Sequence, residues 1–427
     1  MTIPDFNDPS LRNLSLEEKR KIANERATVL KASIQEYLDA REDIPTGINQ
    51  KDNYEKQKKK ILELLKATEA EWNDWKWQVR KRFTKVKDLA KILNLSEKEK
   101  QEIEEVGKRF RWAISPYYLS LMDPDNPEDP IRKQGVPSKA EILDTLGETD
   151  PMGEEFTSPA PHITRRYPDR LIINVTNQCG MYCRHCQRRR NIGEVDQGTP
   201  KEELEQAIEY IRQNEEIRDV LLTGGDAFML SDERIDWLLG KLRAIPHLEI
   251  IRLGSRTPVT LPQRVTPQLV EILQKYHPVF VNTHFNHPKE VSEDAARAAD
   301  LLSRAGVPIG NQTVLLNGVN NDKYVMKKLN HELLKIRVRP YYIFHAKPVK
   351  GTTHFNTKIE DGLEIMEHLR GYTSGLAIPT YIINAPHGYG KTPMLPEYLI
   401  SQGKDKVTIR TWEGRIIEYP NIGPEEN

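Results

Sequence analysis

Seven short apolar segments recur from residue 171 onward, and their spacing constrains the fold more than any other feature. Most begin about thirty residues apart, and charged segments with helical patterning, such as PKEELEQAIEYIRQN, separate them. Strands that alternate with helices at such a spacing form parallel βαβ units. We therefore expect an α/β fold with a partial (β/α)6-type barrel, and a doubly wound open sheet is the alternative. The predicted strands are LIINVT (171–176), DVLLTGG (219–225), LEIIRLG (248–254), PVFVNTHF (278–285), PIGNQTVLL (308–316), RPYYIFH (339–345) and PTYIINAP (379–386).

The remaining sequence divides into regions of different character. Residues 1–122 predict a helical region, in which SLEE (15–18) and SEKE (96–99) are capping-box patterns that begin helices. Residues 123–169 are rich in proline and predict an ordered connector on the surface. The barrel is expected over residues 170–395. The extension at 396–427 contains a predicted β-hairpin that turns near Glu413-Gly414.

Composition excludes several classes of partner. Lys plus Arg and Asp plus Glu both number 63, which removes the simplest electrostatic case for binding nucleic acid or an anionic membrane. The first thirty residues lack the apolar segment of a signal peptide, and no apolar run is long enough to span a membrane. We expect a cytoplasmic protein with no nucleic-acid and no membrane partner.

All three cysteines, Cys179, Cys183 and Cys186, lie in QCGMYCRHCQRRR (178–190). In a reducing compartment such a cluster indicates a metal site. Structural zinc requires four protein ligands, and His185 could become the fourth only by straining against Cys186. A [4Fe–4S] cluster held by three thiolates instead keeps one iron open for a small molecule. We favour the iron–sulfur cluster over zinc.

Polar residues follow the predicted strands where each one ends. Because the carboxyl ends of parallel strands share one edge, we expect these residues to form one rim that is suited to anions. The rim comprises the cysteine loop, Gly224, Gly225, Asp226, Ser255, Arg256, His284, Asn286, His287, Asn311, Gln312, Lys347, Asn384 and Lys391.

The segment APHGYGKT (385–392) fits the P-loop pattern formally. A P-loop must begin a helix, whereas prolines follow here at positions 393 and 396. A lysine on a glycine-rich loop at a strand end can instead form a Schiff base with pyridoxal phosphate (PLP). Lys391 is therefore the candidate PLP lysine, with Arg166, Arg170 and Gln312 as candidates for its phosphate, and a nucleotide-binding protein is the alternative.

The C-x3-C-x2-C loop after the first strand is similar to that of the radical S-adenosylmethionine (SAM) superfamily. The resemblance implies a radical SAM barrel in which SAM chelates the open iron. It also implies that Gly224, Gly225 and Asp226 meet the methionyl amino group and that His185 lies near the adenine. Ser255 and His284 join the expected cofactor-binding residues.

The chain as a whole resembles the lysine 2,3-aminomutase family. The resemblance rests on strings such as SPYYLSLMDPDNPEDPIRKQ, RYPDR, CGMYCRHCQRRR, DVLLTGGDA, GSRTPV, NTHFNHP, GNQTVLLNGVN and GKTP. It implies that the three cysteines hold the cluster, that Lys391 carries PLP and that Arg188 pairs with the α-carboxylate of an amino acid. Arg189 and Arg190 are expected to be a solvated basic stripe.

The sequence departs from the lysine enzymes at the substrate end. They bind the distal ammonium of lysine with two aspartates, and here Lys347 and Asn384 stand at those positions. The expected substrate is therefore L-glutamate, whose amino group would move from C2 to C3 to give β-glutamate, with L-lysine as the alternative. An iron–sulfur electron carrier is a third possibility. We also expect a flavodoxin- or ferredoxin-like electron donor, a homo-oligomer and no structural zinc.

Overall fold

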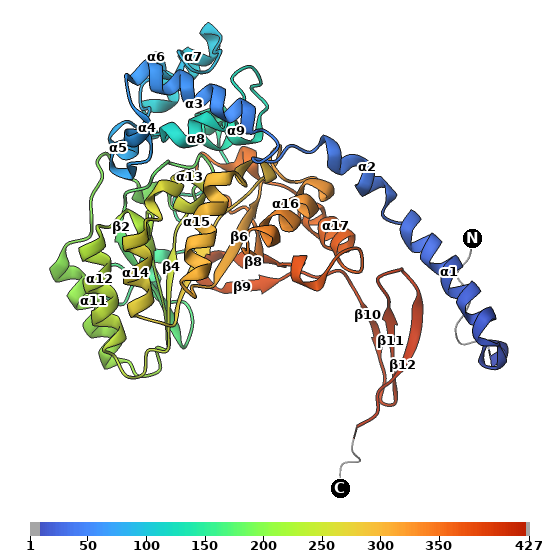
Figure 1. Cartoon of the computed structure of the whole chain (residues 1–427). Helices are drawn as coiled ribbons and strands as arrows, with labels where there is room; N and C mark the ends of the chain where they lie inside the picture. Colours follow the sequence, from blue (N-terminus) through green and yellow to red (C-terminus); the bar gives the residue numbers. More distant parts are fainter. Residues whose placement is uncertain (1–8, 424–427) are drawn as a thin grey trace. The chain divides into compact units, whose positions relative to one another are not determined.

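The computed structural model describes residues 9–423, so the beginning of the predicted helical region and the last four residues of the extension lie outside the described residues. The chain divides into two compact units between Pro45 and Thr46. The first unit consists of a 3-10 helix (Pro9–Asn13) and helices α1 (Leu16–Ala32) and α2 (Gln35–Asp43) (Figure 1). The predicted capping box at Ser15 is present.

All seven predicted strands form in the second unit. They are β2 (Arg170–Thr176), β3 (Asp219–Gly224), β4 (Ile250–Gly254), β5 (Val279–Thr283), β6 (Ile309–Leu315), β7 (Arg339–His345) and β8 (Thr380–Ala385). These strands are parallel and adjacent in chain order. The short strands β1 (Ile163–Thr164) and β9 (Gly390–Pro393) pair antiparallel at the two edges. Because the sheet keeps two edges, the barrel is partial, as predicted.

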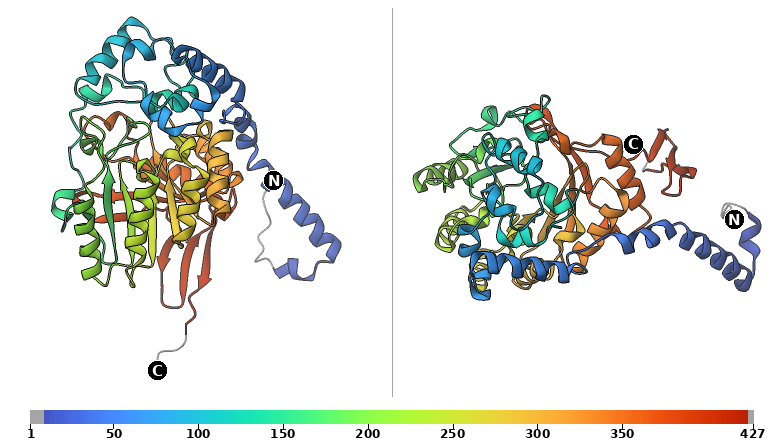
Figure 2. Two further views of the ribbon diagram at one scale, coloured as in Figure 1. Left: turned by 60° about the vertical axis from the view of Figure 1, so that its left-hand side comes forward. Right: turned by 90° about the horizontal axis from the view of Figure 1, so that it is seen from above.

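One helix or more connects each pair of consecutive parallel strands and covers the outer face of the sheet (Figures 1 and 2). Amphipathic spacing explains this packing: α15 buries Ala295, Ala298, Ala299 and Leu302, which recur along one side of the helix. The connecting helices are α11 (Lys201–Gln213), α12 (Asp232–Arg243), α13 (Thr257–Thr260), α14 (Pro267–Lys275), α15 (Glu293–Arg304), α16 (Lys323–Lys335) and α17 (Ile359–Leu369).

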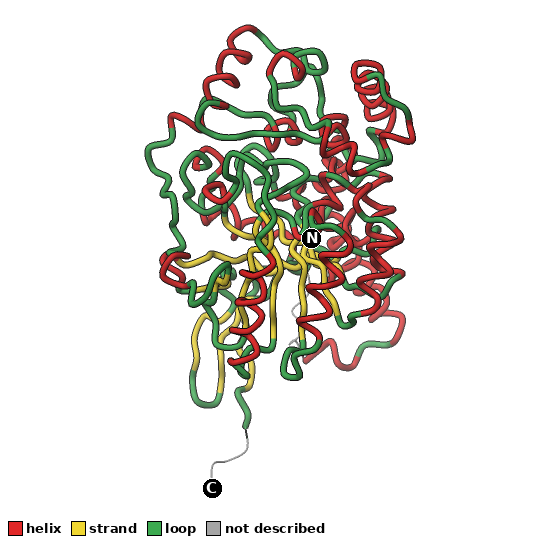
Figure 3. Tube along the Cα trace, turned by 90° about the vertical axis from the view of Figure 1, so that its left-hand side faces the viewer, coloured by secondary structure: helices red, strands yellow, loops and turns green. Residues whose placement is uncertain are grey.

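Short helices precede the barrel and lie over the loops that follow its strands (Figure 3). They are α3 (Lys51–Leu65), α4 (Glu69–Trp72), α5 (Trp75–Arg80), α6 (Val86–Leu89), α7 (Glu97–Gly107), α8 (Pro116–Ser120), α9 (Pro130–Gly135) and α10 (Ala140–Leu143). The capping box predicted at Ser96 begins α7. The proline-rich connector does more than cover the surface, because Ile131, Gln134 and Glu141 are fully buried.

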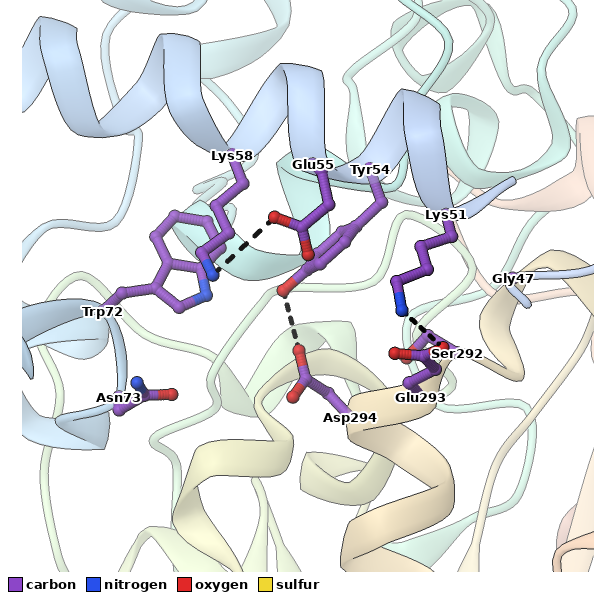
Figure 4. A pocket seen from close by; sticks show the side chains of 10 residues that line it. All are labelled: Gly47, Lys51, Tyr54, Glu55, Lys58, Trp72, Asn73, Ser292, Glu293 and Asp294. Carbon is purple, nitrogen blue, oxygen red and sulfur yellow. Dashed lines mark hydrogen bonds and ion pairs between the residues drawn. The ribbon is translucent and has the colours of Figure 1, made fainter. Parts of the chain in front are cut away.

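Polar contacts attach α3 to the beginning of α15 around a small pocket of about 90 Å³ (Figure 4). The Tyr54 hydroxyl donates to Asp294 over 2.7 Å, and Lys51 pairs with Glu293 over 2.9 Å. Lys58 lies 5.7 Å from the centre of the Trp72 ring. These groups satisfy one another, so we interpret the pocket as part of the packing between α3 and the barrel.

The C-terminal segment forms an antiparallel sheet of β10 (Leu399–Gln402), β11 (Lys406–Arg410) and β12 (Ile416–Pro420). Strands β11 and β12 are the predicted hairpin, and β10 adds a third strand. Trp412 packs edge-on against Tyr372, at 5.1 Å between ring centres. Within residues 9–423 no helix has the length and apolar character needed to cross a bilayer.

Candidate active site

A cavity of about 250 Å³ opens at the carboxyl ends of the parallel strands and contains most of the predicted rim. Asn286, His287 and Asn311 are buried and do not line it. The three cysteines, Lys391 and the expected substrate-binding residues all contribute to its lining. Seven basic side chains line it, against the single carboxylate of Asp226. The basic residues are Arg166, Arg170, Arg188, Arg252, Arg256, Lys347 and Lys391.

Buried ion pairs hold the cysteine loop in place. Arg184, between Cys183 and His185, donates to both oxygens of the Glu141 carboxylate, at 2.9 and 2.5 Å. Arg189 reaches the same carboxylate over 2.9 Å. All three side chains are at least nine-tenths buried. The loop is thereby fixed to α10 at residues adjacent to its cysteines.

The three thiols suit an iron–sulfur cluster better than zinc. Cys179, Cys183 and Cys186 line the same cavity, and the Arg256 guanidinium donates to Cys183 Sγ over 2.6 Å. Within the described part of the chain, no three His, Cys, Asp or Glu side chains converge as a site for a single metal ion. Three soft donors on one loop without a fourth thiolate are the set expected for a cluster with an open iron.

The glycines after β3 allow the chain to approach the cysteine loop closely. A Cβ on Gly225 would lie 2.4 Å from the Gln178 carbonyl oxygen, and Gly224 has a φ of +115°. Asp226 is buried, and its carboxylate accepts from the backbone N–H groups of Phe228 and Arg256 at 3.0 and 2.6 Å. Burial raises the pKa of Asp226 to about 6. In this structure these residues shape the loops that surround the thiols.

The other expected cofactor residues also reach the cavity. His185 lies 3.3 Å from the Asn286 amide and packs edge-on against Phe355. Burial, reinforced by Arg256, lowers the pKa of His284 to about 4, so this ring is neutral at pH 7. Ser255 Oγ lies 2.8 Å from Thr257 Oγ1, and Gln312 reaches the cavity from β6.

Lys391 lies in an aromatic surrounding on β9. Its ammonium is 5.4 to 6.0 Å from the ring centres of Tyr167, Tyr342 and Phe344. Burial, followed by the positive charges of Arg170 and Arg252, lowers the pKa of Lys391 to about 8. Desolvation among cations activates a lysine for imine formation, so its surroundings fit a PLP-bearing residue.

The P-loop alternative is wrong. Lys391 lies in a strand that pairs antiparallel with β8, in register with Asn384, and no helix follows it within the described residues. The backbone N–H of Lys391 donates to the Tyr167 hydroxyl over 2.9 Å and so faces a side chain of the barrel.

A second carboxylate, Glu154, organises the arginines at the cavity. It accepts from Arg166 over 2.8 Å and from Arg190 over 2.7 Å, and Arg188 lies 3.8 Å away. These charges hold the pKa of Glu154 below its usual range although burial raises it. Arg166 and Arg188 thus keep an orientation toward the cavity that unpaired arginines would lose.

The expected solvated stripe at Arg189 and Arg190 is wrong. Arg189 is buried, donates to the Gly351 carbonyl and lies 4.5 Å from the centre of the Phe110 ring. Arg190 is largely buried between Asp150 and Glu154. A run of basic residues indicates solvent exposure only where no acidic residues pack onto it. Here the connector at residues 123–169 supplies the acidic residues Glu141, Asp150 and Glu154.

Lys347 follows β7 and lines the cavity with Asn384 of β8. Its ammonium donates to the Gln187 amide oxygen over 2.5 Å. Burial, together with the charges of Arg188 and Arg166, lowers the pKa of Lys347 to about 7. Lys347 and Asn384, the two residues expected to bind the distal end of the substrate, thus lie in the same cavity as Arg188.

Sequence reasoning missed several residues of the cavity. Arg252 is the clearest, because a charged residue in the centre of the apolar strand LEIIRLG is itself a signal of an inward-facing polar site. Tyr167 stacks on Arg170 at 4.0 Å. Glu154 and Gln187 carry no local signal, since their partners lie far away in the sequence.

Comparison with known proteins agrees with the fold. The family model described as Radical SAM superfamily matches residues 173–327, and the one described as Lysine-2,3-aminomutase matches residues 366–426. Glutamate 2,3-aminomutase of Clostridioides difficile (strain 630) is 58% identical over 94% of this chain and 96% of that protein. L-lysine 2,3-aminomutase of Clostridium subterminale is 52% identical over 84% of this chain and 86% of that protein. L-lysine 2,3-aminomutase of Bacillus subtilis (strain 168) is 49% identical over 84% and 77%, respectively.

The half-barrel with its three-cysteine loop after the first parallel strand defines a radical SAM enzyme. Within that class, the chain belongs to the lysine 2,3-aminomutase family. It is therefore an aminomutase, an isomerase that depends on a [4Fe–4S] cluster, SAM and PLP.

Proposed function

We propose that this enzyme moves the amino group of L-glutamate from C2 to C3 and so produces β-glutamate. The amino group and one hydrogen atom exchange carbons, so the reaction involves no net oxidation or reduction. The observation that carries the proposal is the basic lining of the cavity, in which Lys347 lies with Arg188, whereas the carboxylates that pair with the lining arginines, Glu154, Asp219 and Glu290, lie outside the lining. A substrate with two carboxylates complements this lining, whereas the distal ammonium of lysine would face Lys347 at a cost of several kcal/mol.

Residues that line the cavity can bind each of the cofactors. When bound, the cluster with SAM supplies a radical that takes hydrogen from the substrate, and PLP carries the amino group. In our proposal Cys179, Cys183 and Cys186 hold the cluster, and Lys391 anchors PLP. Arg166, Arg170 and Gln312 bind its phosphate. Gly224, Gly225, Asp226, His185, Ser255 and His284 surround SAM.

The amino acid itself is held at both ends. Arg188 presents a guanidinium fork to the α-carboxylate, a geometry that a lysine cannot reproduce. Lys347 and the Asn384 amide bind the distal carboxylate. Fixing both ends sets the position of C2 and C3, which restricts the hydrogen that is removed.

The test is an anaerobic assay of the reconstituted protein with SAM, PLP and dithionite, in which L-glutamate and L-lysine are offered separately. Formation of β-glutamate without β-lysine is expected. Formation of β-lysine alone would retain the aminomutase chemistry and overturn the substrate assignment. The C. difficile relative, a glutamate 2,3-aminomutase by name, supports the choice of substrate.

A double substitution tests the pocket directly. Lys347→Asp with Asn384→Asp is expected to weaken glutamate turnover by at least about a hundredfold, because two charge-assisted contacts are lost and repulsion replaces them. If the double variant still prefers glutamate, the distal carboxylate binds elsewhere.

Several finer assignments stay predictions. They are the boundaries of the four expected regions, a flavodoxin- or ferredoxin-like electron donor, assembly as a homo-oligomer and a cytoplasmic location. The balanced total charge, with 63 basic and 63 acidic residues, supports a small-molecule rather than a nucleic-acid partner.

A further inference from the structure

Gln187 lies at a restricted point of the cysteine loop. It directly follows Cys186 and precedes Arg188, and the backbone N–H of Arg189 closes a turn around this pair by donating to the Cys186 carbonyl over 3.2 Å. The buried contacts of Arg189 with Glu141 and Gly351 anchor the end of this turn. The backbone at Gln187 is therefore held firmly although the side chain is exposed.

The side chain of Gln187 bridges two elements at the cavity. Its amide oxygen accepts from Lys347 Nζ over 2.5 Å, a contact between residues 160 positions apart. Both residues line the cavity. The amide oxygen of Gln187 accepts a hydrogen bond from Lys347. The amide nitrogen of Gln187 carries N–H groups that can donate to a carboxylate.

We propose that Gln187 determines substrate specificity by holding Lys347 in position for the distal carboxylate of the amino acid. This inference rests on the proposed function. A neutral amide fixes the lysine while leaving its positive charge available to the substrate. A carboxylate at position 187 would bind Lys347 more strongly but would cancel the charge that the substrate needs.

The surrounding charges make such a positioning contact necessary. Lys347 faces the positive charges of Arg166, Arg188 and Lys391, which push its ammonium away, and only Glu154 attracts it among the groups that act on it most strongly. Glu154 already accepts from Arg166 and Arg190 and lies close to Arg188. The Gln187 amide oxygen is therefore the acceptor that fixes the direction of the Lys347 ammonium.

The experiment measures binding separately from turnover. L-Glutamate is titrated into the PLP-loaded protein without SAM or reductant, and the absorbance of bound PLP gives Kd. KM and kcat are measured under full assay conditions. Gln187→Ala removes the contact, and Gln187→Glu adds the competing charge. Gln101→Glu, at an exposed position on α7, is the matched control for the added charge.

We expect Gln187→Ala to raise Kd and KM for L-glutamate about tenfold, with kcat within about twofold of the parent enzyme. Gln187→Glu is expected to raise both constants further, whereas Gln101→Glu leaves them unchanged. Iron content and PLP occupancy should remain at parent levels in all variants. An unchanged Kd in Gln187→Ala, or a fall in kcat and iron content with Kd unaffected, would overturn the proposal.

Failure of the proposed function would look different. In that case the parent enzyme itself would bind L-lysine rather than L-glutamate. The proposed role of Gln187 in binding the distal carboxylate would then also be wrong. If the parent selects L-glutamate and both Gln187 variants bind it equally well, only the assignment of Gln187 is wrong.

Discussion

The side chain of Lys347 changes between its charged and its neutral form near neutral pH. Burial and the nearby guanidinium groups of Arg188 and Arg166 lower the pKa of Lys347 to about 7, while Glu154 opposes them. A lysine with an ordinary pKa would be fully charged under all physiological conditions. Recognition of a carboxylate at this position therefore depends on pH in a range where the substrate carboxylates stay ionised.

The sign of this dependence follows from the lowered pKa. Lys347 carries its charge below about pH 7 and loses it as the pH rises, so kcat/KM for L-glutamate is expected to fall as the pH increases through about 7. In Lys347→Gln, kcat/KM should be lower throughout, and this step should be absent. A pH profile of both enzymes provides the measurement. The same step in the Lys347→Gln profile would assign the titration to another group, with Lys391 the first candidate.

At the scale of elements, the cysteine loop depends on α10. Glu141 compensates two buried guanidinium groups, and removal of one partner from a buried ion pair typically costs about 3 to 5 kcal/mol. We expect Glu141→Gln to lower the free energy of unfolding by about that amount and to reduce the iron bound per chain, because Arg184 adjoins Cys183. Thermal unfolding and iron analysis test this.

The control for that variant is Glu105→Gln. Glu105 pairs with Lys139 over 3.7 Å, and both side chains are about half exposed, so less than about 1 kcal/mol should be lost. Equal effects of the two substitutions would show that burial of the Glu141 pairs does not matter for the loop.

A second prediction concerns the contact between helices α3 and α15. Tyr54→Phe removes the hydrogen bond to the Asp294 carboxylate, which is worth about 1.5 to 3 kcal/mol. Amide hydrogen exchange in α3 should become faster, whereas Lys51→Met, which breaks an exposed ion pair, should change it little. Unchanged exchange in Tyr54→Phe would mean that the bond between Tyr54 and Asp294, drawn in Figure 4, does not hold α3 in place.

Local sequence patterns predicted the helices and strands well, but they did not predict the side-chain contacts between residues that are far apart in the sequence. Apolar strands, capping boxes and polar residues at strand ends depend on neighbours within a few positions, so β2 to β8 and the cavity rim could be predicted. Glu141 and Arg184 are 43 positions apart, and Lys347 and Gln187 are 160 apart. Such contacts depend on tertiary packing, which no local pattern encodes. Arg189 was misjudged for this reason.

At the scale of the whole molecule, the C-terminal sheet presents an apolar face that is not buried. Strand register places Leu399, Val407, Ile409, Ile417 and Tyr419 on one side of the sheet. Leu399 and Tyr419 are 56% and 59% exposed. An apolar face on a small sheet usually marks an interface. The expected homo-oligomer would cover it by placing the same sheet, or another face, of a second copy against it.

The face can be tested by two substitutions that add charge without entering the cavity. Ile417→Lys with Tyr419→Lys is expected to reduce the assembly to a smaller species, because an interface that desolvates two unpaired ammonium groups loses several kcal/mol. Thr408→Lys adds one positive charge on the opposite face of the sheet and should leave the mass unchanged. Light scattering coupled to size exclusion gives the mass of each variant. If all three proteins have one mass, the subunits associate elsewhere or not at all, and this face is not their interface.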